Sequence, residues 1–113
     1  MRYLCLAYGD EKDWKRLPKR EQDELLSHDA KIRERGALMG AVKTEVVTVR
    51  AWEGVPSVSD GPQGPMPVPL AGFSIIEADS LEDVIRQVAD TPCARARGTI
   101  EIRSILTLNR KAV

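Results

Sequence analysis

Two short segments of this sequence, residues 2–8 and 71–78, are apolar at most positions. A strand with one wet face alternates apolar and polar residues, whereas a nearly continuous apolar run is typical of a strand buried on both faces. The chain has only 113 residues, which is enough for one domain with a modest core. A sheet built around these two segments must therefore be covered on both sides by very few elements.

Helical patterns follow each of two strand-like regions. The first, over residues 18–35, has Pro18 at its start and Gly36 as a helix stop. The second, over residues 80–91, begins with Ser80 three residues before Asp83, which approaches a capping box. Its apolar residues recur at helical spacing.

Further strands are expected over residues 37–43, 45–53 and 99–108. The first two predict an antiparallel hairpin joined near Lys43 and Thr44. Residues 54–70 contain five of the seven prolines and three of the eight glycines, so they are expected to form a Pro-rich loop. A loop of this length is often functional or part of a subunit contact.

The order of these segments is β-α-β-β-loop-β-α-β. It predicts an α+β fold of the ferredoxin-like kind, an antiparallel sheet with two helices on one face. No element remains to cover the other face. We therefore expect a homodimer that packs through the sheet face about a two-fold axis.

Composition and charge exclude several classes of protein. Lys plus Arg and Asp plus Glu are 17 each, and this balance argues against a nucleic-acid partner. No apolar run approaches the roughly 18 residues that cross a membrane, and no secretory signal is evident. One His with two separated cysteines does not build a metal site, and no cofactor motif is present. Reduced Cys5 and Cys93 fit a cytoplasmic protein.

Several short motifs occur together in a particular order: Asp60-Gly61-Pro62, then Gly72-Phe73-Ser74-Ile75-Ile76, then Gly98-Thr99-Ile100-Glu101-Ile102-Arg103. In this order the chain resembles the YCII-related family, in particular its DGPF-type branch. The resemblance implies a single YCII-related domain over residues 1–113 and a dimeric α+β barrel fold. Most members of the family have no assigned reaction, and some relatives look like dehalogenating or lactone-handling enzymes.

The chain departs from the family pattern at three places. Gln63 stands where the family turn usually continues with Phe, and Ser104 stands where the last strand usually has Pro. Enzyme-like relatives carry a His-Asp pair on the first helix. His28 is on that helix, but nearer its end than the family His.

Two residues are candidates for acid–base catalysis. His28 titrates near neutral pH, and Glu24, one helical turn earlier, is better placed to orient it than the adjacent Asp29. The alternative is a helix residue at the solvent edge. Asp60 is either a carboxylate at the mouth of a cleft or an Asp that shapes a turn.

Three residues are candidates for ligand binding. Glu101 and Arg103 share one face of the last strand and can bind a small acid through the guanidinium, or form a surface ion pair of little value. Tyr8 lines an apolar pocket with other aromatic residues, or belongs to the core or an interface.

Two functions follow from these candidates. The first is a small-molecule enzyme or binder with a cleft between sheet and helices, gated by the Pro-rich loop, with His28 or Asp60 as acid or base and Arg103 as anion anchor. The alternative is a non-catalytic dimeric interaction or regulatory module, with residues 54–70 packed on a partner.

Overall fold

The computed structural model describes residues 1–109 of the chain. Strands and helices follow one another in this order: β1 (Arg2–Tyr8), α1 (Glu11–Lys15), α2 (Lys19–Glu34), β2 (Leu38–Ala41), β3 (Val47–Arg50), β4 (Ser57–Asp60), β5 (Leu70–Glu77), α3 (Leu81–Val88), α4 (Pro92–Arg95) and β6 (Thr99–Ser104).

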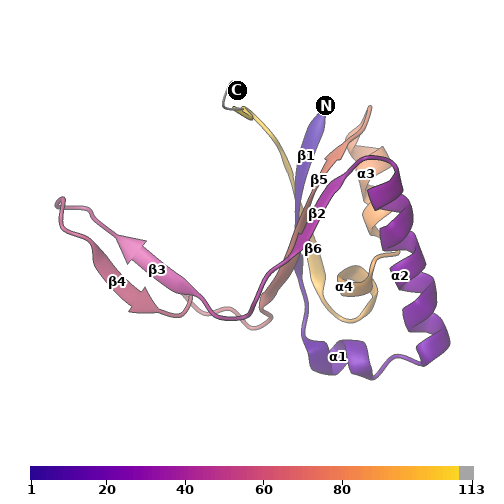
Figure 1. Cartoon of the computed structure of the whole chain (residues 1–113), viewed down its shortest axis with the longest axis horizontal. Coiled ribbons are helices and arrows are strands. Elements are labelled where there is room, and N and C mark those ends of the chain that lie inside the picture. Colours follow the sequence, from indigo (N-terminus) through magenta and orange to yellow (C-terminus); the bar gives the residue numbers. More distant parts are fainter. Residues whose placement is uncertain (110–113) are drawn as a thin grey trace.

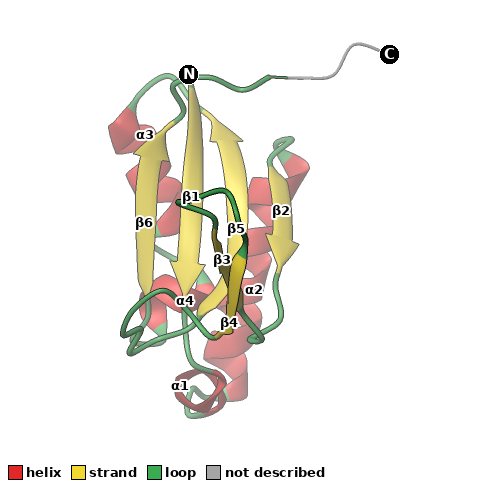
Figure 2. Ribbon diagram, turned by 90° about the vertical axis from the view of Figure 1, so that its left-hand side faces the viewer, coloured by secondary structure: helices red, strands yellow, loops and turns green. Residues whose placement is uncertain are grey.

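Four strands form the main sheet in the order β2-β5-β1-β6, and every neighbouring pair is antiparallel (Figure 2). The two apolar segments of the sequence are the central strands β1 and β5, which explains why both need cover on two faces. With α2 and α3 as the crossovers, this is the ferredoxin-like α+β topology that the sequence predicts. The prediction of the fold class is confirmed.

Helices α2, α3 and α4 lie on one face of the sheet (Figure 1). The core forms between them and the sheet, from the residues Tyr3, Cys5, Ile32, Ile76, Ala78, Val84 and Val88. Ser80 caps α3, because its hydroxyl oxygen accepts a hydrogen bond of 3.2 Å from the Asp83 amide. No helix in the described part of the chain is long and apolar enough to span a membrane.

The opposite face of the sheet, here called the open face, is turned toward the viewer in Figure 2 and carries none of the described helices. It presents the alternate residues of the central strands, which are the half-buried Leu4, Leu6, Phe73 and Ile75. Leu6 lies between Phe73 and Glu101 in the strand register. An apolar row of this kind is what a second protein layer would cover.

Residues 43–68, here called the arm, project from the end of the sheet on the side of the open face (Figures 1 and 2). The predicted hairpin between residues 37–43 and 45–53 is wrong. Instead β2 pairs with β5, and β3 pairs with β4 in a separate two-stranded sheet. Residues 54–70, expected as a loop, therefore contain β4. A period-two pattern identifies a strand but not its partner, and nothing in it distinguishes a main-sheet strand from one in the arm.

Element ends also differ from the expectation. The last strand ends at Ser104 rather than residue 108, because Ile105 is the last residue whose amide donates to β1, at Arg2. The short helices α1 and α4 lie outside the two helices that the sequence predicts. Both begin at favourable N-terminal residues, Asp10 for α1 and Thr91 with Pro92 for α4.

Candidate functional site

A cleft of about 180 Å³ lies between the helix-side face of the sheet and the helices. Its walls are mostly apolar, with a few polar side chains among them. The lining residues are Cys5, Ala7, Asp29, Met39, Gly40, Ala41, Ala71, Gly72, Phe73, Ser74, Val88, Thr91, Pro92, Cys93 and Ile100. An apolar cleft with a few polar groups is the usual form of a small-molecule site.

Asp29 is the ionisable acid of this cleft. It follows Leu25 by four residues and precedes Ile32 by three on α2, so it shares the helix face of these two buried residues. Burial raises the pKa of the Asp29 carboxyl, and the nearby charges of Arg33 and His28 only partly oppose this. A half-buried carboxyl with a raised pKa in a cleft is a candidate general acid or base.

Cys93, at the start of α4, is the second ionisable group of the cleft. Its sulfur packs so closely over Gly9 that a Cβ added at Gly9 would come within 2.8 Å of it. Burial raises the pKa of the Cys93 thiol, and the charge of Asp29 raises it further. The thiolate is the reactive form of cysteine. At pH 7 Cys93 therefore lines the cleft as a neutral, weakly nucleophilic thiol.

Two further polar groups line the cleft. Thr91 donates its hydroxyl hydrogen to the Val88 carbonyl at 2.5 Å. The Ser74 hydroxyl lies near Cys5, whose pKa is raised by burial and only partly lowered by Ser74. Among the described residues, no buried side-chain nitrogen or oxygen is left without a partner.

A larger groove of about 490 Å³, here called the Trp14 groove, shares Ala71, Pro92 and Cys93 with the cleft. Its other lining residues are Gly9, Asp10, Glu11, Trp14, Leu26, Val42, Thr44, Pro69, Leu70 and Ala96. The cleft and the groove therefore adjoin at these three residues.

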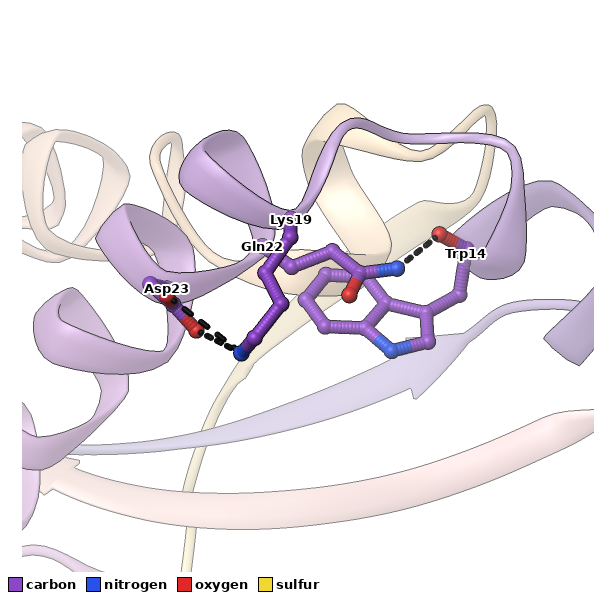
Figure 3. Close-up of polar contacts among 4 residues, drawn as sticks. All are labelled: Trp14, Lys19, Gln22 and Asp23. Carbon is purple, nitrogen blue, oxygen red and sulfur yellow. Dashed lines mark hydrogen bonds and ion pairs between the residues drawn. The ribbon is translucent and has the colours of Figure 1, made fainter.

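The position of Trp14 is fixed from α2. Gln22 donates a hydrogen bond of 2.9 Å from its amide nitrogen to the Trp14 carbonyl (Figure 3). Asp10 accepts a bond of 2.9 Å from the Lys12 amide and so starts α1. Lys19 and Asp23 pair on the exposed side of α2, at 3.1 Å. The Gln22 bond and the Asp10 cap position the backbone of Trp14, which lines the groove, whereas the exposed Lys19–Asp23 pair does not contact it.

The two acid–base candidates of the sequence lie outside the cleft. His28 is half-buried on α2 and lines two shallow surface depressions, both shared with Arg20 and Glu24. Asp60 is exposed at the end of β4 in the arm, where Gly61 turns the chain with a positive φ and donates to the Val46 carbonyl at 2.7 Å. Adjacent helix residues point about 100° apart, which is why His28 faces outward while Asp29 faces the cleft.

The three ligand-binding candidates come together, but on the open face. Tyr8, Glu101 and Arg103 lie on the adjacent strands β1 and β6. The Glu101 carboxylate accepts a hydrogen bond from the Tyr8 hydroxyl and raises the pKa of Tyr8, whereas Arg103 lowers it. The structure therefore does not bring Arg103 together with His28 or Asp60 in one sheet–helix cleft.

From the sequence, Asp29 was considered only as a partner of His28, with Glu24 preferred, and not as a cleft residue in its own right. Its signal was present, because an acidic residue stands at the i+4 position from Leu25 and i−3 from Ile32, within the apolar stripe of α2. A charged residue in such a stripe is either paired or functional. Among residues 1–109, no group of three or more His, Cys, Asp or Glu side chains could hold a metal ion.

Comparison with known proteins gives one family and a likeness to solved structures. The model of the family described as YCII-related domain matches residues 1–109. No curated protein matches the sequence. Among solved structures, the chain is similar to 5-chloro-2-hydroxyhydroquinone dehydrochlorinase (TftG) from Burkholderia phenoliruptrix AC1100, in complex with 2,5-dihydroxybenzoquinone. The identity is 14%, the match covers 93% of each chain, and the TM-score is 0.48.

Proposed function

This chain belongs to the YCII-related domain family, and on that premise we propose that it binds a small molecule in the cleft between sheet and helices. The observation that carries the proposal is Asp29, a half-buried carboxyl with a raised pKa in an apolar cleft. An apolar cleft beside a half-buried ionisable acid is costly to maintain for stability alone. The walls favour a compact ring compound with one polar or ionisable group.

If the bound compound is also transformed, Asp29 is the residue we propose as the acid or base. A raised pKa brings a carboxyl closer to neutral pH, where it can both accept and return a proton. Cys93, held as a neutral thiol, shapes the cleft and does not act as a nucleophile. Proton transfer on a small apolar substrate is thus the reaction class that these residues support.

Tryptophan fluorescence offers a direct test of binding. In a Trp52→Phe variant, Trp14 is the remaining tryptophan, and it lines the groove that adjoins the cleft. We would titrate this variant with a panel of monocyclic phenols, lactones and carboxylic acids. At least one compound should change the Trp14 emission with saturation.

The role of Asp29 is tested in the same variant with two further substitutions. Asp29→Asn keeps the shape of the side chain and removes its charge, and should weaken binding about tenfold or more. Asp23→Asn changes an exposed carboxyl on the same helix and should leave binding unchanged. No saturable response to any compound, or equal binding by the Asp29→Asn protein, would contradict the proposal.

We further propose a homodimer through the open face, with the cytoplasm as the compartment. Leu4, Leu6, Phe73 and Ile75 form an apolar row there, and burying such a row is favourable by about 25 cal/mol per Å². The two described cysteines are free, as in a reducing compartment. Membership of the DGPF-type branch rests on Asp60-Gly61-Pro62 and stays a proposal.

A second candidate function is a non-catalytic dimeric interaction or regulatory module. The exposed apolar arm favours it, because an enzyme cleft alone does not require one. The fluorescence titration separates the two functions, since a pure interaction module would leave Trp14 unaffected by every compound.

A further inference from the structure

Five apolar side chains of the arm are each more than 60% exposed. Val47, Val49 and Val58 are 62%, 61% and 64% exposed, and Val55 and Trp52 near the tip are 78% and 88% exposed. Isolated apolar side chains on a surface are normal, but a contiguous group of this kind marks an interaction site. Trp52 alone can bury roughly 150–250 Å².

The three valines lie on one face of the ribbon, whose end also carries Asp60 opposite Val47. Val49 is directly opposite Val58, and Val47 is two residues away on the same strand, so their side chains share a face. The other face carries Thr48, Arg50, Ser57 and Ser59. The ribbon is thus amphipathic, although within the described structure no layer covers its apolar side.

A two-stranded ribbon without such a layer is at best marginally stable in water. Two side-chain contacts support the arm: Thr48 donates to the Gly61 carbonyl at 2.6 Å, and the Arg50 guanidinium lies 5.8 Å from the centre of the Trp52 ring. A partner that covers the valine face would supply the missing stabilisation.

The reach of the arm indicates which partner this is. The longest extent of the molecule is 50 Å, and it runs along the arm in Figure 1. One layer of helices on a sheet is roughly 20 Å thick, so the arm accounts for a large part of this length. It projects on the side of the open face, where a second sheet would lie only about 10 Å away.

We infer that the arm of each subunit reaches past the partner's sheet in a homodimer and packs its valine face against the second copy of this chain. This inference rests on the sheet-face dimer proposed above. Two-fold symmetry makes the contact reciprocal, so that six arm valines become buried per dimer. The contact is continuous with the open face and adds to the interface area there, where a stable dimer needs about 800 Å² per partner.

Sedimentation velocity over a range of protein concentrations tests this inference on the full chain. The variant Val47→Thr/Val49→Thr/Val58→Thr keeps the β-branched shape of the side chains and removes their apolar surface. It should raise the dimer dissociation constant at least about 100-fold. The matched control Ser57→Thr/Ser59→Thr changes the other face of the same ribbon and should leave the constant within about threefold.

A second measurement leaves the arm valines unchanged. Hydrogen–deuterium exchange of the wild-type ribbon, residues 47–60, should be slower at dimer concentrations than after dilution to the monomer. Equal exchange at both concentrations would overturn the inference, whatever the stability of the valine variant.

The remaining outcomes separate this inference from the proposed function. A wild-type dimer whose dissociation constant is the same in the valine variant overturns the arm contact only. A wild-type protein that stays monomeric at about 100 µM overturns both the arm contact and the sheet-face dimer. This concentration is about 100 times a dissociation constant of 1 µM. Ligand binding in the cleft, read from Trp14, is independent of both results.

Discussion

Asp29 is a carboxyl held against the apolar side of its own helix. It lies on the α2 face that buries Leu25 and Ile32, where water is partly excluded. Burial disfavours the charged form, so the pKa of Asp29 is higher in the folded chain than in the unfolded one. The folded state therefore binds this proton more tightly, and Asp29 links folding to pH.

The first prediction concerns the pH dependence of stability. As pH rises from the ordinary carboxyl pKa of about 3.9 through the raised pKa of folded Asp29, the unfolded chain ionises first and the wild type loses stability. Asp29→Asn removes this loss. The variant should therefore gain stability relative to the wild type as pH rises, by less than about 1 kcal/mol, because the carboxyl is only half-buried.

Urea unfolding at pH 4, 5.5 and 7 measures this difference. Asp23→Asn, on the exposed side of the same helix, serves as the reference. This variant loses the ion pair with Lys19. Apart from that loss, its free energy of unfolding relative to the wild type should vary little over these pH values. A pH-independent difference for Asp29→Asn would show that the carboxyl is not perturbed by burial.

The second prediction concerns Cys93, whose thiol pKa is raised by burial and by the charge of Asp29. Removing that charge in Asp29→Asn lowers the Cys93 pKa and increases the thiolate fraction. Alkylation of Cys93 by iodoacetamide at pH 8 should therefore be about twofold faster or more. Peptide mass mapping separates Cys93 from Cys5, and an unchanged rate would place Asp29 too far away to act on the thiol.

Among the elements, α3 shows how a local sequence signal fixes a core residue. Ser80 caps the helix through its hydroxyl, and the helix then places Val84, which has no exposed surface, against the sheet. Removing the cap leaves the Asp83 amide without this partner. The effect is local, but it acts on an eight-residue helix that has little else to define its start.

The third prediction is that Ser80→Ala lowers the free energy of unfolding by about 1 kcal/mol. Ser80→Asp, which retains a side-chain acceptor at the same position, should cost less than about 0.5 kcal/mol. Chemical denaturation of the three proteins at pH 7 compares them. Equal losses in both variants would mean that the hydroxyl has a role other than capping.

The elements that the sequence predicted correctly are those determined by residues close together in the sequence. Both long helices follow from caps, stops and apolar spacing, and both central strands follow from their continuous apolar runs. Partners of strands are non-local, so the pairing of β3 with β4 instead of β2 could not be read from alternation in residues 45–53. The cleft was missed for a similar reason, because it needs Asp29 of α2 and Cys93 of α4, which are 64 residues apart in the sequence, and only the fold brings them to one space.

At the scale of the molecule, one sheet separates two surfaces with different chemistry. The helix side encloses the cleft and the Trp14 groove. The open face carries an apolar row, and the polar side chains of Tyr8, Glu101 and Arg103 lie beside it. Because the cleft lies on the helix side and shares only Phe73 with the apolar row of the open face, the sheet can form a dimer contact without closing the proposed binding site.

The fourth prediction places a charge at the centre of the open face. Leu6 lies on β1 between Phe73 and Glu101, so a lysine at this position has a carboxylate neighbour in the monomer and can reach water there. In a sheet-to-sheet dimer the same ammonium group would be buried opposite its two-fold copy, at a cost that the single pair with Glu101 cannot offset.

Leu6→Lys should therefore raise the dimer dissociation constant at least about 100-fold while the protein stays folded, and Leu6→Met, which conserves volume, should change it little. Sedimentation velocity gives the constants, and far-UV circular dichroism confirms the fold. If Leu6→Lys remained a dimer as tight as the wild type, the contact would lie elsewhere, and the open face would have to be covered in another way. If the protein dissociated but still bound a compound near Trp14, the cleft would be complete within one subunit, as its lining by residues of a single chain leads us to expect.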